Sequence, residues 1–422
     1  MSTTSSSTAA LVGRGDLGWQ EEFYRDLHRN PELSHQEHRT AAKVAERLGR
    51  LGCEVLTGVG GTGVIGLLRG GPGPVVLLRA DMDALPVREA TGLPYASEVT
   101  TDEDVPRPVM HACGHDVHVT CLLGAAQLLA EGREHWSGTL IALFQPAEEI
   151  GDGARGMVED GLRERVPEPD VVLGQHVLPA PAGTIATGTG PVFAAADSLR
   201  ITVHGRGGHG SMPHAAVDPV VVAAMIVVRL QTIVSREVPP GEQVVLTVGS
   251  VRAGAKSNVI PDTAVLELNL RTYDERIRQR VLAAVERIAR AECTASGCPA
   301  EPGFERYGRY PVTDNDAEAT ERVTGALRAH FGADRVGDMG RLSASEDFGE
   351  LAAAFGAPSS YWALGGTDPE VFERARRGGD LARDLPTNHS SLFAPVPSPT
   401  LRVGAEALAV AALAWLGGGA GN

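Results

Sequence analysis

The chain passes from apolar to acidic residues within positions 75–83, which read VVLLRADMD. The apolar half is typical of a buried strand, and further short apolar runs follow at 139–144 and 171–173. A longer helical pattern at 117–131 separates the first two runs. Because such alternation extends from about residue 18 to 187, it favours an α/β fold in which helices pack on a sheet.

The pattern changes between about 190 and 305. A strand at 199–204 precedes a helix that Asp218 and Pro219 would open, as its N-cap and its first residue. Apolar residues then alternate with mostly polar ones at 263–271, which predicts a half-buried strand. A helix at 274–293 and a last strand near 303–310 complete the order β-α-β-β-α-β, the split βαβ plan of a small independent domain.

The α/β style returns after about residue 308, with an apolar strand at 359–364 and a closing helix from Leu401. A chain of 422 residues also exceeds what one hydrophobic core usually supports. We therefore expect a loose tail at 1–17, a large domain built from 18–189 and 308–422, and a small domain at 190–307 inserted into it.

The charge of the chain excludes some classes of partner. A net charge of -15 and a pI near 5.4 would repel phosphate backbones and anionic lipids, so we expect neither nucleic-acid nor membrane binding. The helix from Leu401 is interrupted by Arg402 and Glu406, which favours a core helix over a membrane span. The start shows no signal-peptide pattern, and the five cysteines are odd in number and scattered. We expect reduced thiols in a cytoplasmic protein.

Polar side chains of the kinds that bind metals follow several of the predicted strands. Because open α/β sheets build their sites beyond the carboxyl ends of strands, we expect these groups to meet. A lone loop histidine is usually structural and a Glu-Glu pair is usually a solvated face, yet the joint occurrence of Cys, His and Glu favours a divalent, zinc-like metal site. The residues are Asp81, Asp83, His111, Cys113, His115, Asp116, Glu148, Glu149, His176, Asn388 and His389.

Seven segments carry a further pattern. In order, they are LHRNPELS (27–34), RADMDALP (79–86), MHACGHD (110–116), FQPAEE (144–149), GGHGSMPH (207–214), SNVIP (257–261) and SEDF (345–348). Over about residues 20–415 the chain resembles the M20 metallopeptidase family, and in particular its amidohydrolase branch of hippurate hydrolases, N-acyl-amino-acid amidohydrolases and auxin-conjugate hydrolases. The resemblance implies a metal-dependent exopeptidase-like catalytic domain with an inserted ferredoxin-like α+β lid or dimerisation domain.

The same resemblance implies a ligand set for two divalent metal ions. Cys113 would be a thiolate that bridges both ions. His115 and His176 would complete one site, and Glu149 and His389 the other. Such mixed ligands suit zinc, while manganese, cobalt and nickel stay open as alternatives.

The resemblance also implies two roles for acidic residues around this centre. Glu148 would be the general base, which takes a proton from a metal-activated water and passes it to the leaving nitrogen. Asp83 and Asp116 are candidates for partners that orient the ligand imidazoles. Asp116 fits equally well as the N-cap of the helix that follows.

Residues of the inserted domain resemble substrate-binding groups of the family. Arg271 would bind a substrate carboxylate, although its position alone favours a surface salt bridge, and Asn258 of the SNVIP segment would also contact substrate. His209 would reach the facing subunit of a homodimer and donate a hydrogen bond to the oxyanion of the reaction intermediate.

The expected activity is hydrolysis of the amide bond of small N-acyl amino acids. An N-acyl-diaminopimelate deacylase or a dipeptidase of the same family is the alternative. A metal-binding or ligand-binding protein without catalysis is a remote third reading. The stretch 100–108 is longer than the resemblance leads us to expect and would reshape the rim of the site.

Overall fold

The computed structural model describes residue 12 and residues 15–416, so the tail expected at 1–17 lies mostly outside the described residues. The chain forms two compact units. The small unit comprises Phe193–Thr313 and Arg341–Glu346, and the rest of the described chain forms the large unit. The small domain expected at 190–307 did not include 341–346. This segment belongs to the small unit because Ala194 N–H donates to Ala344 O at 2.8 Å and Phe193 forms a β-bridge with Leu342.

The large unit contains an eight-stranded mixed sheet in the order β1-β2-β4-β3-β5-β16-β6-β15. The strands are β1 (Glu54–Val59), β2 (Gly63–Gly71), β3 (Val75–Asp81), β4 (Gly138–Gln145), β5 (Val171–Pro181), β6 (Ile185–Thr187), β15 (Val336–Asp338) and β16 (Ser359–Thr367). β3 pairs in parallel with both β4 and β5, and β16 pairs in parallel with β5. Every residue of β4 is buried, as expected for a central strand that is covered on both faces.

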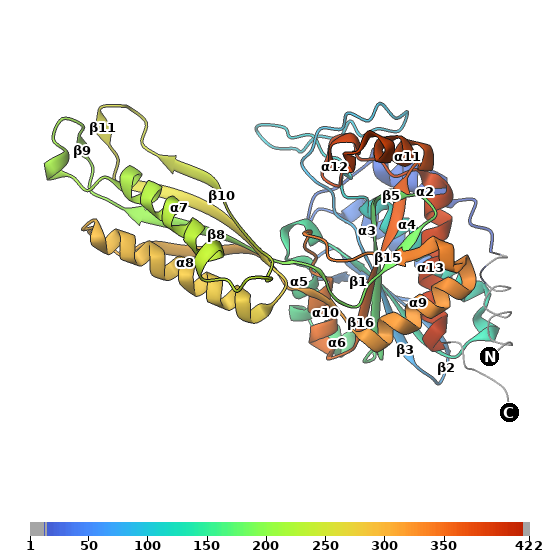
Figure 1. Ribbon diagram of the computed structural model, residues 1–422. Coiled ribbons are helices and arrows are strands. Elements are labelled where there is room, and N and C mark those ends of the chain that lie inside the picture. Colours follow the sequence, from blue (N-terminus) through green and yellow to red (C-terminus); the bar gives the residue numbers. More distant parts are fainter. Residues whose placement is uncertain (1–11, 13–14, 417–422) are drawn as a thin grey trace. The chain divides into compact units, whose positions relative to one another are not determined.

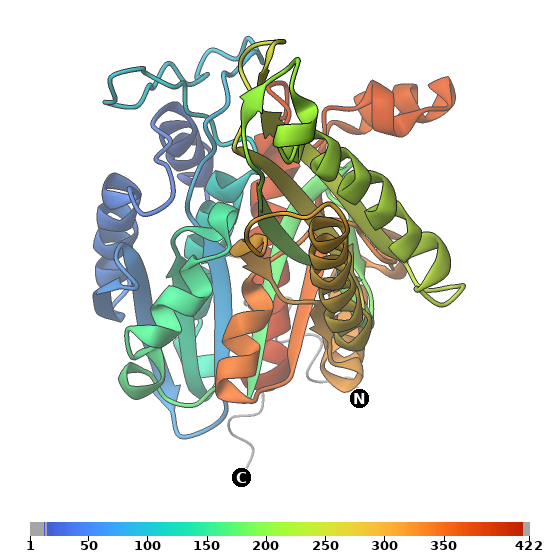
Figure 2. The same ribbon diagram turned by 90° about the vertical axis from the view of Figure 1, so that its left-hand side faces the viewer.

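Helices cover both faces of this sheet (Figures 1 and 2). On one side lie α2 (Gln20–Arg29), α4 (His115–Glu131), α9 (Ala317–Phe331) and α13 (Pro397–Leu416), and on the other α5 (Gly153–Glu159), α6 (Leu162–Arg165) and α10 (Phe348–Phe355). The remaining helices are α3 (His38–Arg50), α11 (Pro369–Gly378) and α12 (Leu381–Asp384). α13 packs against α4 and α9 and is buried along most of its length. This confirms the core helix that the sequence predicts from Leu401.

The small unit is an antiparallel sheet in the order β10-β12-β8-β13, with two helices packed on it. Its chain order is β8 (Ala195–His204), α7 (Pro219–Arg236), β10 (Val244–Ala253), β12 (Thr263–Thr272), α8 (Glu275–Ala295) and β13 (Gly303–Tyr310). This is the predicted βαββαβ order. The Asp218 carboxylate accepts from Val220 N–H at 2.9 Å and Pro219 is the first helical residue, so both predicted helix-start signals are confirmed. A short ribbon pairs β9 (Gly208–His209) with β11 (Val259–Ile260).

Two helices, α7 and α13, are long and apolar enough to cross a membrane by length and composition. In α13 most of the apolar stretch is buried inside the large unit. In α7 one face packs on the small sheet through Val222, Ile226, Leu230 and Ile233, while Val221, Met225 and Val228 are exposed. α7 is therefore a helix with one packed and one uncovered apolar face.

Candidate metal centre

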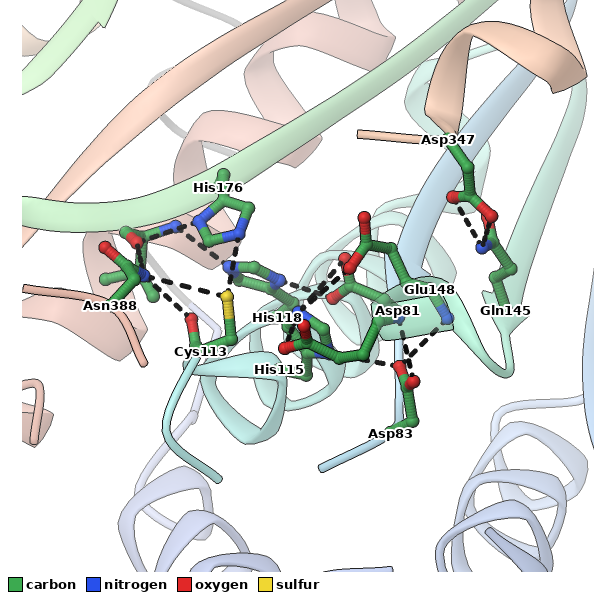
Figure 3. A network of polar contacts seen from close by, with 12 residues as sticks. Asp81, Asp83, Cys113, His115, His118, Gln145, Glu148, His176, Asp347 and Asn388 are labelled. Atoms are coloured by element: carbon green, nitrogen blue, oxygen red, sulfur yellow. Dashed lines mark hydrogen bonds and ion pairs between the residues drawn. The ribbon is translucent and has the colours of Figure 1, made fainter. Parts of the chain in front are cut away.

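The predicted ligands gather along the edge of the sheet at which three neighbouring strands have their carboxyl ends, and Figure 3 shows Cys113, His115 and His176 there. β3 ends at Asp81, β4 ends three residues before Glu148, and β5 carries His176. These strands are mutually parallel, so their carboxyl ends share one edge of the sheet. α4 begins at His115 and brings the Cys113 segment to the same place.

Two groups of candidate ligands share the sulfur of Cys113. One group is Cys113, His115 and His176, and the other is Cys113, Glu149 and His389. Within each group the ligand atoms all lie within 4.8 Å of one another. The five residues predicted as ligands are thus brought together in two groups that share Cys113, and His115 also forms a group with Glu148 and Glu149.

The ring orientation of two histidines suits metal binding. His176 Nδ1–H donates to the Val177 carbonyl at 2.8 Å, so its Nε2 holds the lone pair and lies 3.5 Å from Cys113 Sγ. His115 Nδ1 lies 3.3 Å from Asp83 Oδ1, and its Nε2 lies 3.9 Å from Glu149 Oε1. In both rings Nε2 faces the other ligands.

A third histidine, His118, also lies at the centre and was not singled out from the sequence. With Asp81 and His115 it forms another group of ligand-type atoms. Its Nε2 accepts from Val177 N–H at 2.8 Å, and its Nδ1–H donates to Asp81 Oδ1 at 2.5 Å. Because both ring nitrogens are engaged, His118 holds the strand that carries His176 rather than offering a free ligand atom. Its position three residues after His115 on one helix face was the available signal.

The buried carboxylate of Asp83 holds the segment that carries both glutamates. Asp83 accepts from Glu148 N–H at 3.1 Å and Glu149 N–H at 3.0 Å, and Ser34 Oγ donates to it at 2.7 Å. Glu148 itself is 5% exposed, and its Oε2 lies 4.0 Å from His115 Nε2. The predicted base therefore lies beside the predicted ligands, and Asp83 lies next to the imidazole of His115.

Asp116 was predicted either to orient a ligand imidazole or to cap the following helix, and its contacts in the structure differ from both. The N-cap of α4 is Gly114, at φ 86°, so Asp116 does not cap the helix. Its carboxylate accepts from His28 Nδ1–H at 2.7 Å and from Val117 N–H at 2.9 Å. His28 is not one of the predicted ligands, so the imidazole that Asp116 orients lies behind the centre.

Asn388 connects three segments that carry ligands, and the sequence indicated it only as a neighbour of His389. Its Nδ2 donates to the Cys113 carbonyl at 3.1 Å and to the Val177 carbonyl at 3.2 Å. The next residue, His389, has φ 70° and places its Nε2 3.4 Å from Glu149 Oε2. A single amide thus ties together the Cys113, His176 and His389 segments (Figure 3).

The donor set fits divalent cations. Among the described residues, His115 Nε2 and Glu149 Oε1 are buried with no hydrogen-bond partner. Burial raises the pKa of the Cys113 thiol well above its usual value and the pKa of Glu149 to about 8. Both groups would therefore keep their protons at neutral pH unless a cation stabilised their charged forms. Sulfur, imidazole and carboxylate donors together are the set that zinc-like ions prefer.

The other predicted site residues belong to the small unit. Arg271 donates to the Ser343 carbonyl at 2.6 Å and Ser345 Oγ at 3.1 Å, and it forms no ion pair within the described chain. His209 Nδ1 accepts from Ser211 N–H at 3.1 Å, so its proton resides on Nε2. Asn258 lies beside it, because its carbonyl accepts from Gly210 N–H at 2.9 Å.

Comparison with known proteins decides the family. The model of peptidase family M20/M25/M40 matches residues 77–375. The chain belongs to this family. It is 38% identical to thermostable carboxypeptidase 2 of Saccharolobus solfataricus, over 94% of this chain and 95% of that protein. It is 40% identical to the hippurate hydrolase of Campylobacter jejuni, over 78% of this chain and 84% of that protein.

A solved structure of the family extends the likeness to the fold. The dinuclear metal binding peptidase YXEP of Bacillus subtilis is 30% identical, with a TM-score of 0.74 over 96% of this chain and 98% of that chain. This M20 chain is therefore a metal-binding hydrolase, and its relatives place it in the amidohydrolase branch of the family.

Proposed function

We propose that the protein hydrolyses the amide bond of N-acyl amino acids at a centre of two divalent cations. The observation that carries this proposal is the shared sulfur: Cys113 belongs to both ligand groups, one completed by His115 and His176 and the other by Glu149 and His389. If the Cys113 thiolate held both ions, they would act on the same bound substrate. Zinc suits these donors best, and manganese, cobalt and nickel are the alternatives.

The relatives support an amide whose nitrogen belongs to an amino acid. Hippurate is an N-acyl amino acid, and a carboxypeptidase also releases an amino acid with a free carboxylate. In both reactions, therefore, the leaving group is an amino acid with a free carboxylate. The carboxypeptidase relative also keeps peptide hydrolysis open as a second candidate function.

The chain's own residues divide the work around the scissile amide. Cations held by Cys113, His115, Glu149, His176 and His389 would supply Lewis acidity, which would polarise the amide carbonyl and acidify the attacking water. Glu148 is placed to take a proton from that water and to deliver it to the leaving nitrogen. Asp83 keeps Glu148 in place because its carboxylate accepts a hydrogen bond from the backbone N–H of Glu148. Arg271 and Asn258 are proposed to bind the substrate, with the Arg271 guanidinium on its carboxylate.

We further propose a homodimer formed through the small unit, in which the partner's His209 donates its Nε2–H to the oxyanion. Two features of the small unit support the binding of a second copy of the chain to it. The exposed face of α7 is apolar at Val221, Met225 and Val228, and β10 is an edge strand of the sheet. Such an edge can pair with its own copy across a two-fold axis.

The free thiols of all five cysteines support a cytoplasmic location.

The dimer is tested by mixing two inactive variants, His209→Ala and Glu148→Gln. After subunit exchange, heterodimers carry one doubly damaged site and one intact site, so partial activity should return. A mixture that stays inactive despite proven exchange would show that His209 acts within its own chain or not at all.

The activity is tested with purified protein after metal analysis. The panel contains N-acetyl, N-benzoyl and indole-acyl amino acids, N-succinyl-diaminopimelate and unblocked dipeptides. Glu148→Gln should keep both metal ions and lose turnover by about 10²–10⁴-fold, whereas Glu159→Gln, on the exposed side of α5, should behave as wild type. If Glu148→Gln lost metal while Glu149→Gln kept it, the roles of base and ligand would be reversed. If no amide were cleaved by the metal-loaded protein, the proposal would fail.

A further inference from the structure

The segment between β4 and the two glutamates has an unusual backbone. Ala147 has φ 51°, a left-handed conformation that residues with a side chain rarely adopt. The turn is also tightly packed, because a Cβ at Gly153 would lie 1.6 Å from the Pro146 carbonyl oxygen. Such a conformation persists only where its surroundings hold it.

The buried carboxylate of Glu37 is in contact with this turn. Glu37 Oε1 accepts from Ala147 N–H at 2.9 Å and from His35 N–H at 3.0 Å, and Thr62 Oγ1 donates to Oε2 at 2.5 Å. The side chain is fully buried. Glu37 occupies the N-cap position of α3 but makes no side-chain cap hydrogen bond there. Its carboxylate therefore links the turn, through Ala147 N–H, to His35 and Thr62 and does not cap its own helix.

Together with Asp83, Glu37 binds three consecutive backbone amides. Glu37 accepts from Ala147 N–H, and Asp83 accepts from Glu148 N–H and Glu149 N–H. We infer that Glu37 is a positioning residue of the reaction, which sets the backbone from which both the base Glu148 and the ligand Glu149 project. This inference rests on the proposed function of those two glutamates.

The chain offers a matched control for a merely structural role. Glu32, at the other side of the same helix start, accepts from two backbone amides and a threonine hydroxyl: Arg39 N–H at 2.9 Å, Thr40 N–H at 2.8 Å and Thr40 Oγ1 at 2.9 Å. Within the described residues, no hydrogen bond or ion pair joins the Glu32 carboxylate to the 147–149 segment. A Glu32→Ala variant thus loses the same kinds of bond as Glu37→Ala without releasing the turn.

The test measures kcat, KM and metal affinity separately on metal-loaded full-length protein. Glu37→Ala should lower kcat by about 10–100-fold, with KM changed by less than about threefold, and should weaken binding of one of two zinc ions by about 10–100-fold. Glu37→Gln should stay near wild type, because its amide oxygen can accept from Ala147 N–H while its NH₂ group donates to Thr62. Glu32→Ala should leave kcat and zinc affinity unchanged.

Two further arms keep the outcome decisive. If Glu37→Ala does not fold, Glu37→Asp replaces it: the carboxylate is retracted by one methylene, and kcat should still fall while Glu37→Gln stays active. Wild-type kcat and zinc affinity in a folded Glu37→Ala or Glu37→Asp variant would overturn the inference, as would equal losses in Glu32→Ala. If wild type cleaved no amide, the proposed activity would fail, and zinc affinity alone would still decide the role of Glu37.

Discussion

The imidazole of His28 should govern how the stability of the large unit responds to alkaline pH. Nδ1–H donates to Asp116 at 2.7 Å and Nε2–H donates to Glu89 at 3.2 Å, and all three side chains are buried. Burial of the ring lowers its pKa, but the two carboxylates outweigh this effect and raise the pKa of His28 to about 9. His28 is therefore a cation at neutral pH.

The size of the effect follows from the pKa difference between the folded and unfolded chain. The pKa rises from 6.5 to about 9 on folding, and each pKa unit corresponds to about 1.4 kcal/mol, so the cation contributes about 3 kcal/mol. Because the folded pKa is the higher one, this contribution is complete below pH 6.5 and is lost as the pH rises through about 9. Tyr24, whose pKa is also raised by burial beside His28, titrates at still higher pH.

The assay is urea unfolding of wild type and His28→Gln at about pH 6 and about pH 10. Tryptophan fluorescence reports on the large unit alone, because all four tryptophans belong to it. A chelator is present throughout, since metal binding itself depends on pH. The free energy of unfolding should fall by about 3 kcal/mol more in wild type than in the variant, and shared groups such as Tyr24 cancel in this difference. Equal losses in the two proteins would show that His28 is neutral in the fold.

Three further substitutions test the centre and the substrate contact proposed for the small unit. Cys113→Ser should weaken both metal sites together, because a neutral hydroxyl poorly replaces a shared thiolate; two ions held with wild-type affinity in chelator competition would remove the bridge. Arg271→Lys should raise KM mainly for substrates with a free carboxylate, and equal effects on their amidated analogues would exclude that role. Asn388→Asp cannot donate to the two carbonyls that it now binds, so metal affinity should fall by about 10–100-fold. Asn315→Asp, which also loses two such bonds but lies away from the ligands, should bind metal as wild type does.

Part of the candidate site could be predicted, because Asp81, Glu148 and His176 lie at or soon after apolar runs that form buried strands. β3 and β5 run further than the apolar runs indicated, so Asp81 is the last residue of β3 and His176 lies inside β5, while β4 ends three residues before Glu148. What the sequence could not show was which polar groups are already engaged. His118 has the spacing of a ligand, but its Nε2 already accepts a hydrogen bond from Val177 N–H. Val177 lies 59 residues later in the chain, so the sequence did not reveal this contact.

Long-range partners account for the other differences. Asp116 was predicted to orient a ligand imidazole or to cap its helix, but its partner His28 lies 88 residues earlier in the chain. Ala147 and Glu37 are separated by 110 residues, and no local pattern connects them. The segment 341–346 joined the small unit through hydrogen bonds to residues far away in sequence, such as Arg271 to Ser343. In each case the missing information was the register between packed elements.

The buried charges of the large unit form two sets, and the contrast between them explains why this centre calls for divalent cations. Behind the ligands, carboxylates are paired with fixed cations of the chain: Asp81 with Arg79 at 2.6 Å, and Asp116 with His28 at 2.7 Å. Burying these charges is tolerable because each is compensated and hydrogen-bonded. Among the predicted ligands, by contrast, burial and the nearby carboxylates of Asp83 and Asp81 outweigh the His115 imidazole and raise the pKa of Glu149 to about 8. The fold therefore neutralises its supporting carboxylates internally and leaves the predicted ligands dependent on charge from outside the chain, which divalent cations would provide.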